Sequence, residues 1–168
     1  MTILKILRYP DKRLRQIAKP VKKITFKTKL LINNMFDTMY AAGGIGLAAT
    51  QVNILQQIIV IDISIKPDEK QLILINPIII EMDGSASIEE GCLSIPTKHA
   101  MVPRAQYVKV KSLDLYGNHV EFEASNLLAI CIQHEIDHLY GKLFIDYLSE
   151  SQNDIDLKIN RKKIIITK

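Results

Sequence analysis

Apolar residues recur along this chain with two different periods, which predict helices near both ends and strands between them. Helical spacing runs through residues 26–42 and again through 126–140, where Ser125 or Asn126 is expected to cap the first turn. Residues 1–24 predict an extended arm with one short helix. Both longer helices carry apolar residues on one side, so each is expected to pack against the rest of the fold.

β-branched and alternating apolar runs fill the region between these helices. We expect strands there at residues 57–64, 72–75, 78–82, 108–115 and 120–123. Because helices flank the strands rather than alternate with them, the order predicts an α+β fold with antiparallel or mixed β-sheets. These sheets are expected to pack around a central helix at 126–140, with N-terminal helices before them and a C-terminal helical tail.

Composition favours one globular domain and excludes several classes of protein. The 168 residues are 48% hydrophobic and 24% charged, which is ordinary for a single soluble domain spanning 1–168. The net charge of +4 is too small and too scattered to indicate DNA binding. No apolar run reaches the ~18 residues of a membrane span. The two cysteines are expected to be thiols in a cytoplasmic protein.

His134, Glu135 and His138 form a His-Glu-x-x-His motif inside the helix predicted at 126–140. Residues four apart on a helix lie one turn above each other, so the two histidines can offer two imidazole nitrogens to one metal ion. Glu135 lies next to the first of them, where it can serve as a general base. The alternative is that both histidines are surface or core side chains that bind no ligand.

A catalytic site of this kind needs a third protein ligand, and two cysteines compete for that place. Cys92 lies in a segment expected to be a loop that ends at Pro96, and its thiolate suits a metal of the Zn or Fe type. Cys131 lies on the same helical stripe as His134 and His138, which gives poor tetrahedral geometry. We therefore prefer Cys92 as the ligand and place Cys131 in a pocket wall or the core.

Three segments resemble the motifs of the peptide deformylases, in the order found in that family. They are Gly-Ile-Gly-Leu-Ala-Ala-Thr-Gln at 44–51, Glu-Gly-Cys-Leu-Ser at 90–94 and Gln-His-Glu-Ile-Asp-His-Leu at 133–139. Taken alone, the first of them is equally well a tight turn without chemistry. The resemblance runs from about Leu4 to Leu148 and is closest to the bacterial type with the shorter catalytic core.

This resemblance implies a metal-dependent hydrolase that removes the formyl group from N-formylmethionine of newly synthesised polypeptides and releases formate. It implies one divalent ion on Cys92, His134 and His138, with Fe²⁺ the expected ion and Zn²⁺ or Ni²⁺ able to replace it. The expected partners are N-formylmethionyl nascent peptides. The basic tail at 149–168 is expected to be a solvated end, with a docking surface for the ribosome as the alternative.

The same resemblance gives further residues their roles. Glu135 would accept a proton from water and return it to the leaving amine. The side-chain amide of Gln51 and the backbone N–H of Leu93 would stabilise the oxyanion. Backbone groups of Gly46 and Gly91 would line the extended peptide.

An apolar pocket for the methionine side chain is expected beside the ion. Its candidate residues are Ile88, Leu127, Ile130 and Cys131. Ordinary core packing is the alternative for all of them. Arg104 is expected either to support the segment around Cys92 from behind or to be a surface arginine.

Two other functions remain as alternatives. An HExxH zinc endopeptidase shares the histidine motif, but the metzincin type needs a histidine six positions after His138, where this chain has Phe144. A structural metal site needs four protein ligands, and the other histidines, His99 and His119, lack ligand spacing.

Overall fold

The computed structural model describes residues 2–63 and 71–149. The helical elements are the 3₁₀-helix η1 (Lys12–Arg15), the α-helix α1 (Phe26–Ala41), the 3₁₀-helix η2 (Ala49–Val52), the α-helix α2 (Asn126–Leu139) and the 3₁₀-helix η3 (Phe144–Ser149). The strands are β1 (Gly46–Ala48), β2 (Ile58–Ile61), β3 (Leu72–Asp83), β4 (Ala86–Cys92), β5 (Ile95–Arg104), β6 (Tyr107–Leu113) and β7 (His119–Ser125). The tail predicted at 149–168 lies outside the described residues, except for its first position.

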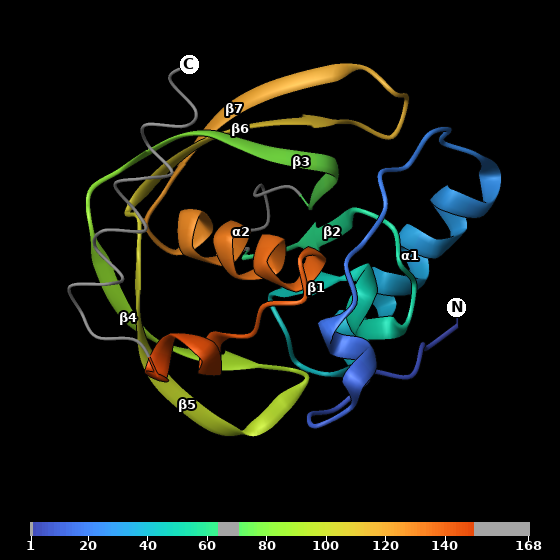
Figure 1. Cartoon of the computed structure of the whole chain (residues 1–168). Helices are drawn as coiled ribbons and strands as arrows, with labels where there is room; N and C mark the ends of the chain where they lie inside the picture. The colour runs from blue at the N-terminus through green and yellow to red at the C-terminus, as the bar shows by residue number, and fades with distance from the viewer. Residues whose placement is uncertain (1, 64–70, 150–168) are drawn as a thin grey trace.

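The strands form two antiparallel sheets with α2 between them. Five strands pair in the order β1-β2-β3-β6-β7, and β4 pairs with β5 in a second, two-stranded sheet. In Figure 1, α2 crosses the middle of the molecule, with β3, β6 and β7 on one side and the β4–β5 hairpin on the other. The α+β prediction with a central histidine helix is confirmed.

Strand β2 shows why this sheet is covered on both faces. Successive side chains of a strand point to opposite faces, and all four residues of β2 are buried. Ile59 and Ile61 pack in the cluster that contains α2, whereas Ile58 and Val60 pack in the cluster that contains α1. Burying each such side chain contributes about 1.5–3 kcal/mol. The apolar run that predicted a strand therefore fixes one helix on each side of the sheet.

The two strands predicted at 72–75 and 78–82 are a single strand, β3. Its register against β6 shifts between Ile75 and Ile78, so the chain passes Asn76 and Pro77 as a bulge. The Asn76 side chain is tied to Val21, accepting from its backbone N at 2.7 Å and donating to its carbonyl at 2.9 Å. The predicted break was wrong because a bulge absorbs the proline without ending the pairing.

The loop expected around Cys92 is instead the tip of a hairpin. Cys92 ends β4 and pairs with Ile95, which begins β5, so only Leu93 and Ser94 form the turn. The segment at 44–51 is likewise more than a turn, because it contains β1 and most of η2.

The strand predicted at 57–64 is shorter than expected, because β2 spans only Ile58–Ile61, whereas the other predicted elements lie close to their bounds. The hairpin β6–β7 and the helices α1 and α2 differ from the predictions by at most two residues at each end. Ser125 is the N-cap of α2, but its side chain makes no capping hydrogen bond within the described chain.

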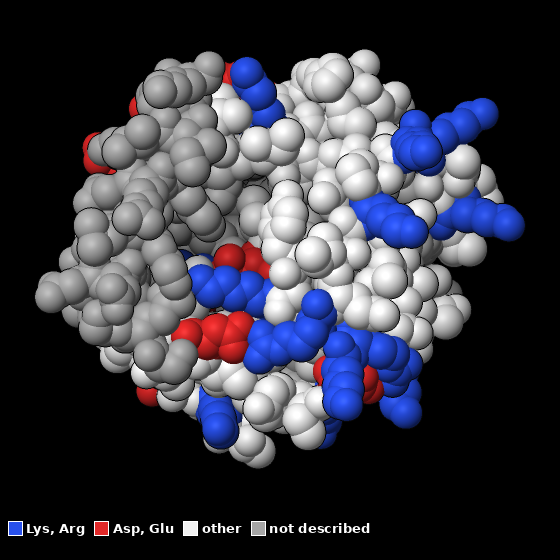
Figure 2. Space-filling model, in the orientation of Figure 1, with Lys and Arg blue, Asp and Glu red and all other residues white. Residues whose placement is uncertain are grey.

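Surface charge is mixed where it is densest. In Figure 2, acidic side chains lie among the basic ones in the lower part of the visible face. Two surface ion pairs show the same mixture, Arg13–Asp11 at 2.7 Å and Arg15–Asp146 at 2.5 Å. Among residues 2–63 and 71–149, no helix has the length and apolar character needed to cross a membrane.

Candidate functional site

One face of α2 carries nearly all of the candidate site residues of this helix. Leu127, Ile130, Cys131, His134 and His138 follow the spacing of residues on one side of a helix. The opposite side packs into the core through residues such as Ile132 and Leu139. A hydrogen bond from Thr50 Oγ1 to the carbonyl of His138, at 3.1 Å, ties the helix end to η2. Core packing and this hydrogen bond hold α2 in the orientation that turns its candidate residues toward the site.

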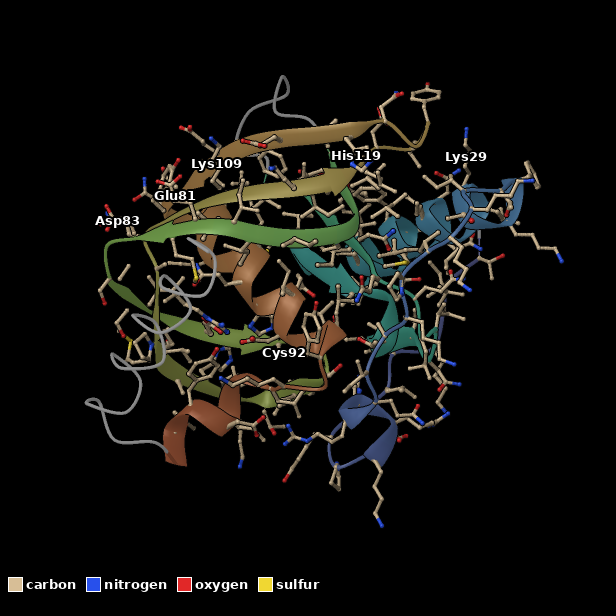
Figure 3. All side chains as sticks on the ribbon, turned by 45° about the horizontal axis from the view of Figure 1, so that its top comes forward. Lys29, Glu81, Asp83, Cys92, Lys109 and His119 are labelled. Atoms are coloured by element: carbon tan, nitrogen blue, oxygen red, sulfur yellow. The ribbon has the colours of Figure 1, made fainter. Side chains whose placement is uncertain are left out.

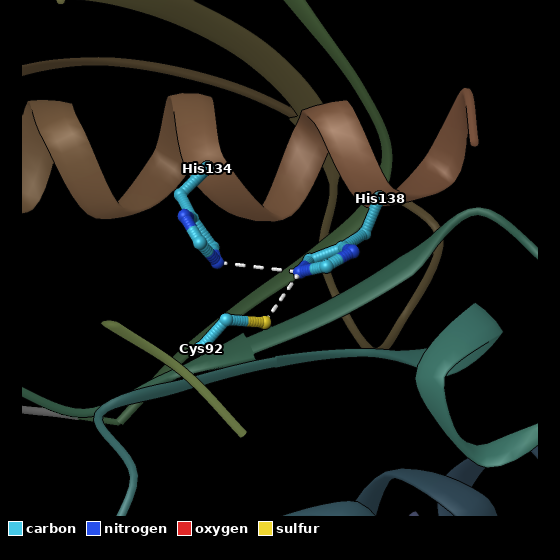
Figure 4. A group of neighbouring side chains, drawn as sticks. All are labelled: Cys92, His134 and His138. Atoms are coloured by element: carbon cyan, nitrogen blue, oxygen red, sulfur yellow. Dashed lines mark hydrogen bonds between the residues drawn. The ribbon is translucent and has the colours of Figure 1, made fainter. Parts of the chain in front are cut away.

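Cys92, His134 and His138 converge on one point. His138 Nε2 lies 3.2 Å from Cys92 Sγ and 3.2 Å from His134 Nε2, and the three donor atoms all lie within 4.8 Å of one another. Figure 4 shows the two rings reaching down from α2 and the cysteine rising to meet them. The structure brings Cys92 into this group and leaves Cys131 outside it.

The donor set fits a divalent ion. One thiolate and two imidazole nitrogens suit metals of the Zn and Fe type. His134 Nδ1 lies 2.8 Å from Glu90 Oε2, so this carboxylate can accept the Nδ1 proton and leave Nε2, which faces the shared point, available to an ion. Both histidines are buried, at 8% and 1% exposure, so water cannot freely compete for their nitrogens.

Glu90 is itself held by a buried arginine. Arg104 is 2% exposed and donates to both Glu90 oxygens, at 2.7 and 3.0 Å. Burial would raise the pKa of Glu90, but hydrogen bonds from His134 and Arg104 outweigh it and lower this pKa to about 2. The carboxylate is therefore charged at neutral pH. Arg104 is therefore not a surface arginine. It supports strand β4, which carries Cys92, as the first of its two predicted positions had it.

Glu135 lies against Gly46, the first residue of strand β1. A Cβ at Gly46 would come within 2.5 Å of Glu135 Oε1 and 2.9 Å of Cys131 Sγ, so only glycine leaves room for both side chains. Burial raises the pKa of Glu135 to about 7. Its Oε2 has no hydrogen-bond partner among the described residues. This carboxyl group is therefore suited to accept or release a proton near neutral pH.

A pocket of about 530 Å³ opens beside the three donor atoms. The sequence-predicted residues that line it are Gly46, Gln51, Ile88, Gly91, Cys92, Leu93, Leu127, Ile130, Cys131, His134 and Glu135. His138 lies behind this wall at 1% exposure. The four candidates for a methionine pocket thus share one cavity with the candidate base and two of the candidate ligands.

Gln51 is buried within this wall and its amide is already engaged. Its Oε1 accepts from the backbone N of Ala48 at 2.8 Å, and its Nε2 lies 3.1 Å from Ser94 Oγ. Nε2 also lies 3.5 Å from Cys92 Sγ, a weak contact that an oxyanion could replace. Leu93 follows Cys92 in the hairpin turn, and its side chain lies against Gly44.

Several site residues escaped the sequence analysis. Glu90, Ser94, Gln133 and Asp137 stand inside the recognised motifs without having been given roles, and Tyr147 was not considered. Gln133 accepts from Ala105 N at 3.0 Å and donates to Ala105 O at 2.8 Å, which fixes α2 to the β5–β6 connection. The degree of burial of these five residues could not be predicted from spacing, although position within a motif was an available signal for four of them.

His99 lacked ligand spacing but lines the pocket. Its ring sits so close to Gly91 that a Cβ there would come within 2.9 Å of it. His119, in contrast, lies at the start of β7, and Figure 3 places it well away from Cys92. Neither belongs to the converging group.

Phe144 occupies the position at which a metzincin would carry another histidine. Its side chain is 1% exposed, and its ring stacks on His134 with centroids 6.3 Å apart. The described residues therefore provide an aromatic wall there in place of a metal donor.

Comparison with known proteins agrees with this geometry. A family model described as polypeptide deformylase matches residues 3–154. A peptide deformylase of Buchnera aphidicola subsp. Schizaphis graminum is 65% identical over 158 residues, covering 94% of each chain. The crystal structure of a peptide deformylase from Legionella pneumophila is 44% identical with a TM-score of 0.84, covering 99% of this chain and 92% of that one.

A third relative was crystallised with a peptide. The Met-Ala-Ser-bound peptide deformylase of Acinetobacter baumannii, class I type b, is 34% identical with a TM-score of 0.83, covering 87% of this chain and 98% of that one. These matches favour a deformylase over the endopeptidase alternative. With 65% identity over nearly its whole length, the chain belongs to the peptide deformylase family.

Proposed function

We propose that this chain removes the formyl group from N-formylmethionine at the start of nascent polypeptides, using an ion held by Cys92, His134 and His138. The observation that carries the proposal is the meeting of these three donor atoms, within 4.8 Å of one another, beside a pocket that is lined by Cys92, His134 and Glu135. Membership of the family supports the reaction, and the geometry supports the assignment of these residues.

The donor set supports a metal of the Zn or Fe type, and we propose Fe²⁺ as the native ion with Zn²⁺ or Ni²⁺ as substitutes. Such an ion would act as a Lewis acid that lowers the pKa of a bound water to about 7. Glu90 would help by holding the Nδ1 proton of His134, which keeps Nε2 free to bind.

The pocket would position the substrate. Ile88, Leu127, Ile130 and Cys131 offer an apolar surface for the methionine side chain, and glycine at positions 46 and 91 lets a peptide backbone come close. Holding the formyl group beside Glu135 converts an encounter in solution into a reaction within one complex. The Met-Ala-Ser bound to the Acinetobacter baumannii relative contains methionine, which supports a pocket that accepts this side chain.

Glu135 would carry the proton. It takes one proton from the attacking water while the new C–O bond forms at the formyl carbon. It then gives that proton to the amine nitrogen as the C–N bond breaks, so formate leaves and a free N-terminal amine remains. Burial, which raises the pKa of Glu135 to about 7, suits it to both steps.

Gln51 and Leu93 would stabilise the tetrahedral oxyanion. The Gln51 amide already points at Cys92 Sγ from 3.5 Å, and Leu93 directly follows that cysteine. One such donor typically contributes about 3–4 kcal/mol in the transition state.

The direct test is an assay on anaerobically purified protein. The chain is loaded with Fe²⁺ or Ni²⁺, and formate release from a formyl-Met peptide is followed together with metal content. We expect formate and free-amine peptide in equal amounts, and no cleavage of an internal peptide bond. Internal cleavage without formate would instead support an endopeptidase.

We also propose that the protein works in the cytoplasm, where nascent chains are made. The basic residues of the tail support association with the ribosome. Removing residues 150–168 should then weaken co-sedimentation with ribosomes while formate release from a short peptide is unchanged. Equal co-sedimentation of the shortened chain would contradict a role of the tail.

A further inference from the structure

The 3₁₀-helix η3 contacts the candidate metal centre but contributes none of the described residues that line the substrate pocket. Phe144 at its start stacks on the His134 ring, with the two planes at 26°. Tyr147, one turn later, reaches the buried charges behind the same histidine. One short element therefore contacts the surroundings of His134 at two points.

We propose that Tyr147 is a positioning residue for His134. It acts through three buried side chains that connect the two, namely Asp137, Arg104 and Glu90. The inference rests on the proposed function only in taking His134 as a metal ligand.

The hydroxyl of Tyr147 closes a triangle with two charged groups. It donates to Asp137 Oδ2 at 2.8 Å and accepts from Arg104 Nη1 at 3.1 Å. Arg104 Nη1 also donates to the same Asp137 oxygen at 2.6 Å. Each member of the triangle bonds to both of the others, so none can move alone.

Arg104 carries this restraint to the histidine. Its other nitrogens grip both oxygens of Glu90, and Glu90 Oε2 in turn lies 2.8 Å from His134 Nδ1. A bidentate guanidinium–carboxylate pair has fixed planar geometry, so a tilt of Arg104 must tilt Glu90. The Tyr147 hydroxyl is thus joined to the imidazole that faces the ion through Arg104 and Glu90, both directly and by way of Asp137.

The Tyr147 hydroxyl matters because the buried charges that it contacts are unbalanced. The cluster contains two carboxylates, on Asp137 and Glu90, but one guanidinium, and all three residues are buried. Without Tyr147, Asp137 would lose its neutral donor and draw more strongly on Arg104 alone. Arg104 would then be pulled away from Glu90, which would loosen the hold on His134.

The Tyr147 ring also contacts two cationic groups. The Arg104 guanidinium lies 4.8 Å from its centroid, and Lys142 Nζ lies 3.4 Å from it. Replacement by phenylalanine keeps this ring and its packing and removes only the hydroxyl. Tyr147→Phe is therefore a specific test of the hydrogen bonds.

The matched control is Tyr40→Phe. The Tyr40 hydroxyl also bonds to an aspartate, Asp62, and it accepts from Gln71 at 2.9 Å, but these residues do not line the pocket. Both variants and the unsubstituted full chain are loaded with Co²⁺, whose visible absorption reports on the ligand geometry. Release of Co²⁺ to an excess of chelator is then timed.

We expect Tyr147→Phe to release Co²⁺ about 3- to 10-fold faster than the unsubstituted chain, with a shifted absorption spectrum. Direct partners of a metal-bound histidine change affinity by about 10- to 100-fold, and Tyr147 acts at a further remove. Tyr40→Phe should match the unsubstituted chain in both readouts. A loss of thermal stability in metal-free Tyr147→Phe, with unchanged release and spectrum, would show a structural role only and overturn the proposal.

The route is tested by a second pair of variants. If Tyr147 acts through Asp137, its substitution should change Co²⁺ release by less than about two-fold when Asp137 is already asparagine. An undiminished effect in that background would overturn the route. An unsubstituted chain that binds no Co²⁺ at all would contradict the proposed function, and this inference with it.

Discussion

Glu90 and His134 are joined by a contact of 2.8 Å between a carboxylate oxygen and Nδ1, which links strand β4 to helix α2. Forty-four positions separate the two residues in the sequence. Glu90 stays charged because Arg104 and His134 lower its pKa to about 2 despite burial. The histidine is thus oriented by a charge that the fold places behind it.

Replacing Glu90 by glutamine should weaken ion binding about 10- to 100-fold, because the charge that holds the Nδ1 proton of His134 is lost. Competition with a metal chelator measures the dissociation constant. The neighbouring Glu89 offers the matched control, since it is exposed and points away from Arg104 in the alternation of β4. Equal affinities of the Glu90→Gln and Glu89→Gln proteins would contradict the assignment.

The two cysteines should behave differently. Cys92→Ala removes one of three ligands and should reduce bound metal from one ion per chain to a small fraction of it, with activity falling in parallel. Cys131→Ser should keep the ion, because its sulfur lies outside the converging group. Metal analysis of both proteins decides the matter. A chain that keeps its ion without Cys92 and loses it without Cys131 would reverse the ligand assignment.

What could be read from the sequence depended on local spacing. His134 and His138 lie four residues apart on α2, and the apolar run forms the buried strand β2. The three motifs contribute residues to one pocket. Strands β4 and β5 could not be read, because much of their length is exposed and apolar alternation is weak.

Of the support behind the centre, only Arg104 was anticipated, as one of two possibilities; its partners could not be predicted because tertiary folding brings them together. Arg104 meets Glu90, Asp137 and Tyr147 across separations of 14, 33 and 43 positions. No spacing rule links such positions in a single sequence. The capping of α2 was predicted from residue type alone. Ser125 is the N-cap, but its side chain makes no capping hydrogen bond within the described chain.

The apolar pocket should give a preference for methionine. A formyl-Met peptide should have a kcat/KM at least about 10-fold above that of the matching formyl-Gly peptide, since each methylene-sized group contributes ~1–3 kcal/mol. A formyl-norleucine peptide serves as the control and should still react well, because its side chain is also unbranched. Equal kcat/KM values for Met and Gly would remove Ile88, Leu127, Ile130 and Cys131 from substrate binding.

If Fe²⁺ is the native ion, activity should decay in air. Both the ion and the Cys92 thiolate can be oxidised, and the thiolate borders the open pocket. The Ni²⁺ form should outlast the Fe²⁺ form under the same conditions. Activity followed over time in air and under argon provides the comparison. Identical lifetimes of the two forms in air would count against iron as the fragile component.

Glu135→Gln tests most directly whether α2 is a catalytic helix. Glutamine keeps the size of the side chain against Gly46 but cannot take up a proton, so the ion should remain and the chemistry should slow. Metal content and formate release from a formyl-Met peptide are measured on the same sample. We predict one ion per chain and a kcat lower by roughly 10²–10⁴-fold. A fully metallated Glu135→Gln protein with unchanged turnover would contradict the account.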